Sequence, residues 1–272
     1  MDKQQPLTYH RVLTIAGSDS SAGAGIQADL KTIAALGCYG ASAITALTAQ
    51  NTTGILGIHP VPPAFVSAQI RAVLTDVGAD AVKVGMVYSA ELMAVIAAEL
   101  RAHEAKNIVV DPVMAAQTGD SLFREAALST IKESLMPLAE VFTPNLPEAG
   151  ILLGYPLDTL DAIRRGAREL ARHGSRYVLI KGGHARNGAT DILYSATEDR
   201  FMSLPGERIP TRNDHGTGCT LSSAIASFLA RGDGVETAVA RAKSYIEGAI
   251  RAGARYAIGQ GRGPLHHFFG YW

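Results

Sequence analysis

The sequence predicts an α/β fold with a mostly parallel central sheet and helices on both of its faces. Short apolar runs of strand length, such as residues 11–16 and 107–111, alternate with longer segments whose apolar residues recur every three or four positions. Glycine-rich or polar residues follow several of the short runs directly. This alternation is typical of strand–helix–strand units, whose functional residues lie at the carboxyl ends of the strands.

The first half of the chain begins with a buried strand at residues 11–16 and a glycine-rich loop at 17–25. A helix follows, and its spacing predicts a buried face made of Ile26, Leu30, Ile33 and Ala34. A second strand-like segment covers residues 39–50. Pro62 and Pro63 begin a helix that runs to about residue 77, because proline is favoured in a first helical turn. A strand at 81–86, a helix at 89–101 and a strand at 107–111 come next.

The second half repeats this pattern. A helical region at about 123–135 and a strand at 140–144 precede helices at 147–153 and 160–173 and a strand at 177–181. Residues 191–209 indicate short strands in a meander. A helix at 221–230, which ends at Gly232, and another at 235–252 complete the predicted elements.

Length and charge limit the class of function. A chain of 272 residues suits one α/β domain and contains no linker-like stretch, so we expect a tail at 1–10 and a single domain at 11–272. Lys+Arg and Asp+Glu are both 25, which leaves no basic field for nucleic acid or a membrane surface. Two cysteines, no signal-peptide pattern and no apolar run of membrane length indicate a cytoplasmic protein that acts on a small molecule.

A glycine-rich turn opens the helix at 221–230. Gly216 and Gly218 stand just before its first turn, where glycine lets backbone N–H groups converge at the positive end of the helix dipole. Such a turn predicts an anion site. Cys219 lies at the mouth of this site, where the dipole and the N–H groups would stabilise its thiolate. These residues alone leave open a turn that binds nothing and an inert buried cysteine.

The loop at residues 17–25 fits a second pattern. Gly23, Gly25 and Ala28 match the G-x-G-x-x-A fingerprint of dinucleotide-binding proteins, between a strand and a helix. That fingerprint also requires an acidic residue about 20 positions later, and no Asp or Glu occurs between Asp29 and Asp76. The loop also lacks the Gly-Lys-Ser/Thr end of a P-loop. A dinucleotide-binding oxidoreductase is therefore a distant alternative.

Three strands end in residues suited to phosphate and metal chemistry. Asp111, Asn145 with Glu148, and Lys181 each follow an apolar strand, so the topology predicts that they meet at one edge of the sheet. Phosphoryl transfer needs cations over the phosphates and oxygen ligands for Mg²⁺. Any one of these residues alone is better explained as a helix cap or a turn residue.

Several motifs, in this order, resemble those of the hydroxymethylpyrimidine and phosphomethylpyrimidine kinases of thiamine biosynthesis. They are Ala-Gly-Ser-Asp, Gly-Ala-Gly-Ile-Gln-Ala-Asp-Leu-Lys-Thr and Ile-Thr-Ala-Leu-Thr-Ala-Gln-Asn within residues 15–51, Gly-Thr-Gly-Cys-Thr at 216–220, and Gly-Pro-Leu-His-His-Phe near the end. The resemblance implies a ribokinase-like three-layer α/β/α fold. Most members of that superfamily have Asp in place of Cys219. Ala22 stands where the family usually has Gly, which we expect to narrow the loop slightly.

The resemblance also implies the reaction and its residues. An ATP-dependent kinase would convert 4-amino-5-hydroxymethyl-2-methylpyrimidine to its monophosphate and then to the diphosphate. The residues implied around the pyrimidine are Gly17, Asp29, Gln50 and Met86. Those implied on the ATP side are Asp111, Asn145, Glu148 and Lys181, with Mg²⁺ held by Glu148 and the nucleotide phosphates. Cys219 would act as the base, and the amides of Gly216, Thr217 and Gly218 would hold developing charge.

The chemistry of Gln50 supports its assignment, because a primary amide matches a ring nitrogen next to an exocyclic amine. Within the fold, the alternative is a pyridoxal kinase, since similar proteins phosphorylate that hydroxymethyl group. Another alternative is a regulatory protein that has the pocket without turnover. The family suggests a homodimer and leaves open whether a monovalent cation accompanies ATP and Mg²⁺. His266 and His267 are adjacent rather than at metal-ligand spacing, which favours a structural role.

Overall fold

The computed structural model describes residues 7–87, 89–113, 121–182 and 189–272, so residues 1–6 of the predicted tail lie outside the described part. The described strands form one sheet. They are β1 (Arg11–Asp19), β2 (Tyr39–Asn51), β3 (Gly54–Pro60), β4 (Ala81–Val84), β5 (Ile108–Val110), β6 (Val141–Phe142), β7 (Tyr177–Ile180), β8 (Asp191–Ser195) and β9 (Arg200–Leu204).

The sheet is mostly parallel, as predicted. Its strand order is β3-β2-β1-β4-β5-β6-β7-β8-β9. Strands β2, β1, β4, β5, β6 and β7 run parallel, whereas β3 at one edge and β8 and β9 at the other pair antiparallel. The chain leaves β1 toward β2 on one side and later returns to β4 on the other. The crevice at the carboxyl ends of β1 and β4 is therefore the switch point at which such sheets bind ligands.

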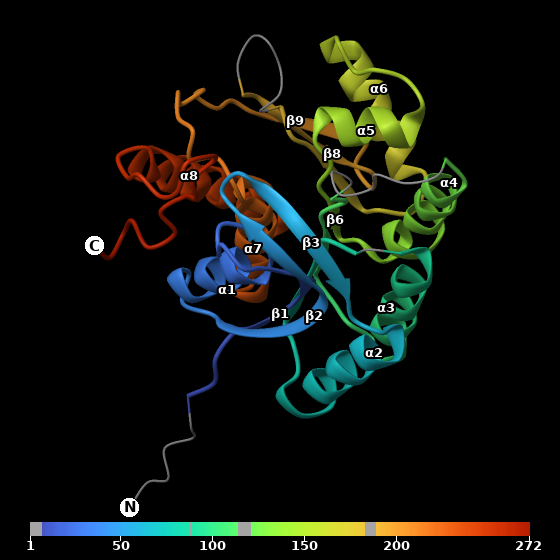
Figure 1. Ribbon diagram of the computed structural model, residues 1–272. Coiled ribbons are helices and arrows are strands. Elements are labelled where there is room, and N and C mark those ends of the chain that lie inside the picture. The colour runs from blue at the N-terminus through green and yellow to red at the C-terminus, as the bar shows by residue number, and fades with distance from the viewer. Residues whose placement is uncertain (1–6, 88, 114–120, 183–188) are drawn as a thin grey trace, which may run out of the picture.

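Helices cover both faces of the sheet. They are α1 (Gly25–Ala35), α2 (Pro63–Ala72), α3 (Ala90–Ala102), α4 (Ser121–Thr130), α5 (Leu146–Leu153), α6 (Leu160–Ala171), α7 (Thr217–Ala230) and α8 (Val235–Gly253). Short helical turns, η1 (Val73–Val77), η2 (Ile131–Leu135) and η3 (Met136–Leu138), continue α2 and α4. Figure 1 shows α1, α7 and α8 on one face and α2 to α6 on the other, which confirms the three-layer α/β/α prediction. No helix in the described part combines the length and apolar character of a membrane span.

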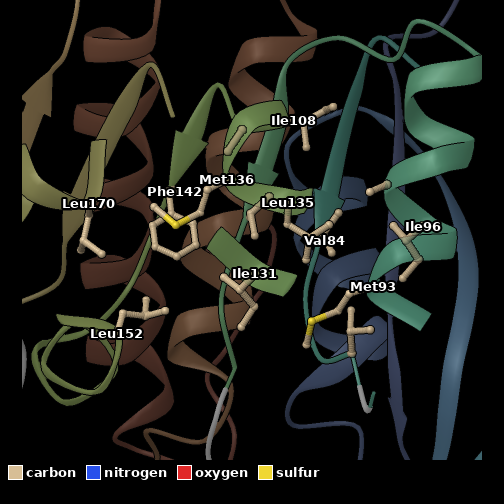
Figure 2. Packing of buried hydrophobic residues seen from close by; sticks show 14 of the residues in the cluster. Val84, Met93, Ile96, Ile108, Ile131, Leu135, Met136, Phe142, Leu152 and Leu170 are labelled. Carbon is tan, nitrogen blue, oxygen red and sulfur yellow. The ribbon is translucent and has the colours of Figure 1, made fainter. Parts of the chain in front are cut away.

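Alternating strand residues supply the two halves of the core. In β4, Val82 and Val84 join the cluster beneath α2 to α6, while Ala81 joins the cluster beneath α7 and α8. Figure 2 shows the first cluster, in which Phe142 of β6 packs near Met136. Strand residues with a period of two therefore face opposite helical layers, as a strand buried on both faces requires.

Three local predictions were wrong. Residues 54–60 form β3 and were not predicted as a strand, because this edge strand has no buried residue and so no apolar alternation. Helix α7 begins at Thr217 rather than at residue 221, because its first turn consists of small and polar residues. Ala34 is exposed, because the buried face of α1 is rotated toward a row that includes the polar Asp29 and Thr32.

Candidate active site

One hollow of about 960 Å³ opens at the carboxyl ends of the parallel strands. All of the predicted site residues except Asp29 line it: Gly17, Gln50, Met86, Asp111, Asn145, Glu148, Lys181, Gly216, Thr217, Gly218 and Cys219. They come from β1, β2, α5, α7 and the segments that follow β4, β5, β6 and β7. The fold thus gathers side chains that lie as far apart in the sequence as Gly17 and Cys219.

The start of α7 forms one end of this hollow. Gly216 is its N-cap, with φ at +87°, and a side chain there would collide with the carbonyl oxygen of Gly23. Glycine is therefore required both by the left-handed backbone and by the close approach of the first loop. A Cβ on Gly218 would lie 3.4 Å from both Asp111 Oδ2 and Lys181 Nζ, so the first turn of α7 faces this charged pair directly.

Lys181 connects the ends of three strands. Its Nζ lies 2.6 Å from Asp111 Oδ1 and 4.0 Å from Glu148 Oε2. This confirms the prediction that the residues after β5, β6 and β7 meet. Burial acts to raise the pKa of Asp111, but the Lys181 and Lys83 ammonium groups outweigh it and lower the pKa. For Lys181 burial acts to lower the pKa, and the neighbouring carboxylates raise it above its ordinary value. The carboxylate and the ammonium are therefore both charged.

Asn145 and Glu148 form a capping box at the start of α5. Asn145 Oδ1 accepts from the Glu148 backbone N–H at 2.8 Å, and Glu148 Oε2 accepts from the Asn145 backbone N–H at 2.8 Å. The described residues contain no group of three His, Cys, Asp or Glu side chains placed to hold a metal. The two carboxylates of Asp111 and Glu148, both near Lys181, nevertheless suit Mg²⁺, which usually takes few protein ligands and completes its shell with phosphates and water.

A second part of the lining is formed by Gly17, Gln50 and Met86. Gly17 and Gln50 both lie at register shifts of their strands, and such bulges re-aim side chains next to active sites. A Cβ on Gly17 would lie 3.2 Å from Met86 Sδ, so these two residues form one wall. Ser20 Oγ holds the backbone of Gln50: it accepts a hydrogen bond from the backbone N–H at 2.8 Å and donates one to the backbone C=O at 2.7 Å.

Asp29 is the one predicted site residue that does not line the hollow. Its carboxylate has no exposed surface and accepts hydrogen bonds from Thr14 Oγ1, Lys83 Nζ and Ser223 Oγ at 2.7, 2.8 and 2.7 Å. The helix turns this residue toward β1, β4 and α7 instead of the hollow, so its position gives no support to the predicted role beside the pyrimidine. Its position one turn into the helix could not distinguish the two directions.

Cys219 lies in the first turn of α7, which begins earlier than predicted, and its thiolate is not favoured. Burial raises the pKa of the Cys219 thiol to about 11, despite the opposing charge of Lys83. The carboxylates of Asp29 and Asp111 raise it further. The predicted lowering by the helix dipole is thus wrong for the free protein, because desolvation outweighs it.

Three charged or polar residues in or near this site, Asp19, Lys83 and His215, had no role predicted from the sequence. His215 Nε2 lies 2.8 Å from Asp19 Oδ2 and 3.2 Å from Gln50 Nε2, at the edge of the hollow. Burial acts to raise the pKa of Asp19, but the hydrogen bonds from His215 and from its own loop hold the pKa well below its usual range. The sequence could have indicated two of these residues as site candidates, because Asp19 ends the Ala-Gly-Ser-Asp motif and His215 directly precedes Gly216.

Comparison with known proteins identifies the family. A model of the phosphomethylpyrimidine kinase family matches residues 19–266. The chain belongs to this family. It is 52% identical over 262 residues to the hydroxymethylpyrimidine/phosphomethylpyrimidine kinase of Rhizobium meliloti, across 96% of this chain and 97% of that protein. It is 51% identical to the thiamine biosynthesis bifunctional protein of Geobacter sulfurreducens, across 98% of this chain but only 54% of that protein.

A solved structure supports the same assignment of fold. An ADP complex of a pyridoxal kinase from Bacillus subtilis is 36% identical and matches with a TM-score of 0.88, across 96% of this chain and 98% of that one. The ribokinase-like fold and the kinase class predicted from the sequence are therefore confirmed. Membership of a kinase family sets aside the dinucleotide-binding oxidoreductase.

Proposed function

We propose that the protein transfers the γ-phosphoryl group of ATP to the hydroxymethyl group of 4-amino-5-hydroxymethyl-2-methylpyrimidine and then, in a second round, to the resulting monophosphate. Residues 11–272 would act as one kinase domain. One observation carries the proposal: a single hollow is lined by Lys181, the first turn of α7 and Gln50. It thus offers a phosphate site and a site for a polar ring edge within reach of each other.

The chemistry depends mainly on position and charge, as phosphoryl transfer through a loose transition state requires. The backbone N–H groups at the start of α7 and the Lys181 ammonium would stabilise charge on the transferring phosphoryl group. Cys219 Sγ would take the proton of the hydroxymethyl group through the small fraction of thiolate. Mg²⁺, held by Glu148, Asp111 and the nucleotide phosphates, would neutralise charge on those phosphates. Whether a monovalent cation assists is part of the same test.

The experiment is a panel of acceptors with ATP and Mg²⁺, in sodium or potassium salts, with products read by mass spectrometry. We expect both phosphorylations of the pyrimidine. Gln50→Met should reduce kcat/KM for the pyrimidine by roughly 10- to 100-fold, because it leaves two ring groups unpaired. It should affect pyridoxal less. An equal loss on both substrates would refute the recognition role of Gln50.

A pyridoxal kinase is the second candidate, because the Bacillus subtilis structure with the same fold is described as one. The same panel decides, since a pyridoxal kinase would turn over pyridoxal with the higher kcat/KM. A regulatory protein without turnover would release no ADP with any acceptor.

We also propose a cytoplasmic homodimer. The edge hairpin of β2 and β3 supports the dimer, because it exposes 47% of Leu47 and 80% of Leu56, and exposed apolar side chains can mark interfaces. Light scattering of the purified protein should give twice the monomer mass. Leu56→Glu should shift the mass toward the monomer, and Glu207→Lys, an exposed change elsewhere, should not.

A further inference from the structure

Gln50 lies in a chain of hydrogen-bonding groups that decides which way round its amide is held. Thr48 Oγ1 lies 2.9 Å from the carbonyl oxygen of Ser18 and 3.1 Å from the amide atom of Gln50 assigned as Oε1. The amide atom assigned as Nε2 lies 3.2 Å from His215 Nε2, which lies 2.8 Å from Asp19 Oδ2. The oxygen and the nitrogen of an amide are told apart by the partners that they meet.

The His215 side of the amide requires an acceptor. Asp19 also accepts from the backbone N–H groups of Ser21 and Ala24 at 2.8 Å each, which keeps its carboxylate ionised. An ionised carboxylate 2.8 Å from His215 Nε2 requires that this nitrogen carries a hydrogen. With the Gln50 nitrogen toward His215, two donors would face each other. The amide oxygen satisfies this position.

The Thr48 side requires a donor, by an independent count. A hydroxyl has one hydrogen, and the carbonyl oxygen of Ser18 can only accept, so the Thr48 hydrogen goes to Ser18. Thr48 Oγ1 is then left as an acceptor toward Gln50, 3.1 Å away. The amide nitrogen satisfies this position. Both neighbours therefore select the same orientation, in which Oε1 and Nε2 of Gln50 exchange the positions assigned to them.

We propose that these neighbours lock the Gln50 amide with its oxygen toward His215 and its nitrogen toward Thr48. The lock would fix which way round the pyrimidine of the proposed reaction binds. His215 and Thr48 are thus positioning residues, which act on the substrate through Gln50. The His215 ring packs directly against the backbone of Gly23, so closely that a Cβ at this position would collide with it. This contact limits the movement of the ring.

The orientation has a consequence for the reaction. The remaining N–H of the amide donates on the Thr48 side and the remaining lone pair accepts on the His215 side, so the ring nitrogen binds near Thr48 and the exocyclic amine near His215. In this substrate the hydroxymethyl group is next to the amine on the ring. His215 directly precedes Gly216, so the lock directs the reacting group toward the start of α7. The reverse orientation would direct it away.

The test pairs two variants with two substrate analogues and measures kcat/KM. One analogue lacks the exocyclic amine, and the other has C–H in place of the neighbouring ring nitrogen. We expect His215→Ala to couple to loss of the amine and Thr48→Val to loss of the ring nitrogen, each by on the order of tenfold. Thr45→Val, a buried hydroxyl of the same strand that donates to Met86 O, is the control and should couple to neither analogue.

The exchanged pattern, with His215 coupled to the ring nitrogen, would overturn the proposal. Equal effects of each variant on both analogues would also overturn it, because they indicate a merely structural role. The lock has a second readout that needs no turnover: nitrogen NMR of the free protein should show His215 protonated at Nε2. A His215 protonated only at Nδ1 would sink the lock, whereas absence of pyrimidine turnover with Nε2 protonated would sink the proposed function instead.

Discussion

Lys83 Nζ lies 2.8 Å from Asp29 Oδ2, and neither side chain has any exposed surface. Asp29 also accepts from Thr14 of β1 and Ser223 of α7, so the pair joins β1, α1, β4 and α7 beneath the active site. Burial acts to lower the pKa of Lys83, but the charge of Asp29 outweighs it and raises the pKa above its ordinary value. The ammonium therefore stays charged in the core.

Removing one member of this pair should be costly. Lys83→Met leaves the Asp29 charge without a cation, which we expect to lower the free energy of unfolding by about 3–5 kcal/mol in urea titrations. Lys106→Met on the surface should change it by less than about 0.5 kcal/mol. The double variant Lys83→Met with Asp29→Leu should recover part of the loss, because no uncompensated charge remains. If the double variant lost as much free energy of unfolding as the two single variants lose together, this account would be contradicted.

The raised pKa of Cys219 predicts how activity depends on pH. If Cys219 acts through a thiolate with a pKa of about 11, kcat should rise by close to tenfold per pH unit between pH 7 and 9. Cys219→Ala should lower kcat by roughly two to four orders of magnitude and abolish the slope. Cys219→Asp should keep more activity than Cys219→Ala and show no slope, since Asp is ionised throughout. A flat wild-type profile would show that the thiolate is not the base.

The same pKa governs alkylation. In a Cys38→Ser background, which leaves Cys219 as the single cysteine, iodoacetamide should react slowly at pH 7 and faster with each pH unit, because only the thiolate attacks. Bound substrate should protect. Fast, pH-independent alkylation at neutral pH would mean that the thiolate is already formed.

One anion site should serve both phosphorylations. A Cβ on Gly218 would lie 3.4 Å from Lys181 Nζ, so Gly218→Asp places a carboxylate at the phosphate position and should abolish both reactions. Gly234→Asp, at the start of α8 where a Cβ meets no atom within 4 Å, is the matched control and should keep both. The monophosphate should also compete with the alcohol. Loss of one reaction alone would require a second site.

His267 should make stability depend on pH. Burial lowers the pKa of this imidazole to about 4, and Nε2 lies 3.0 Å from Thr220 Oγ1. Between pH 6.5 and 4 the unfolded chain binds a proton that the folded protein does not, so the stability falls as the pH falls across this window. The loss should be roughly 2–4 kcal/mol, measured by urea titrations at several pH values. His267→Gln should remove it, and the exposed His59→Gln should not.

Ala22 predicts a gain in stability. The departure from Gly was expected to narrow the loop, but the structure gives a different cost: Ala22 has φ at +63°, a left-handed conformation that disfavours a Cβ by about 1–2 kcal/mol. Ala22→Gly should therefore raise the free energy of unfolding by up to about 1 kcal/mol after the entropy of the unfolded chain is counted. Ala24→Gly, where φ is −132°, should lower it instead. If both substitutions lowered the free energy of unfolding, the backbone of Ala22 would not be strained.

Local pattern was sufficient for most of the architecture. Apolar runs of strand length identified the parallel strands, and three-to-four spacing identified the helices between them, because those elements bury whole faces. The same rule explains why β3 was not predicted. Its side chains are not buried, and the strand is held by backbone pairing with β2. The topology rule alone brought Asp111, Asn145 and Lys181 together, since parallel strands end at one edge.

The tertiary structure decided what spacing cannot express, namely the direction and the environment of single side chains. Asp29 stands one turn into α1, and only the packing of α1 against α7 turned it toward Lys83 instead of the hollow. The sequence placed Cys219 at a helix start, but the pKa depends on how much water the assembled pocket excludes. His215 reached Asp19 and Gln50 from 196 and 165 residues away, respectively. These contacts form only because the fold packs the loop at residues 17–25 against the turn at Gly216. Spacing along the chain cannot predict such an approach.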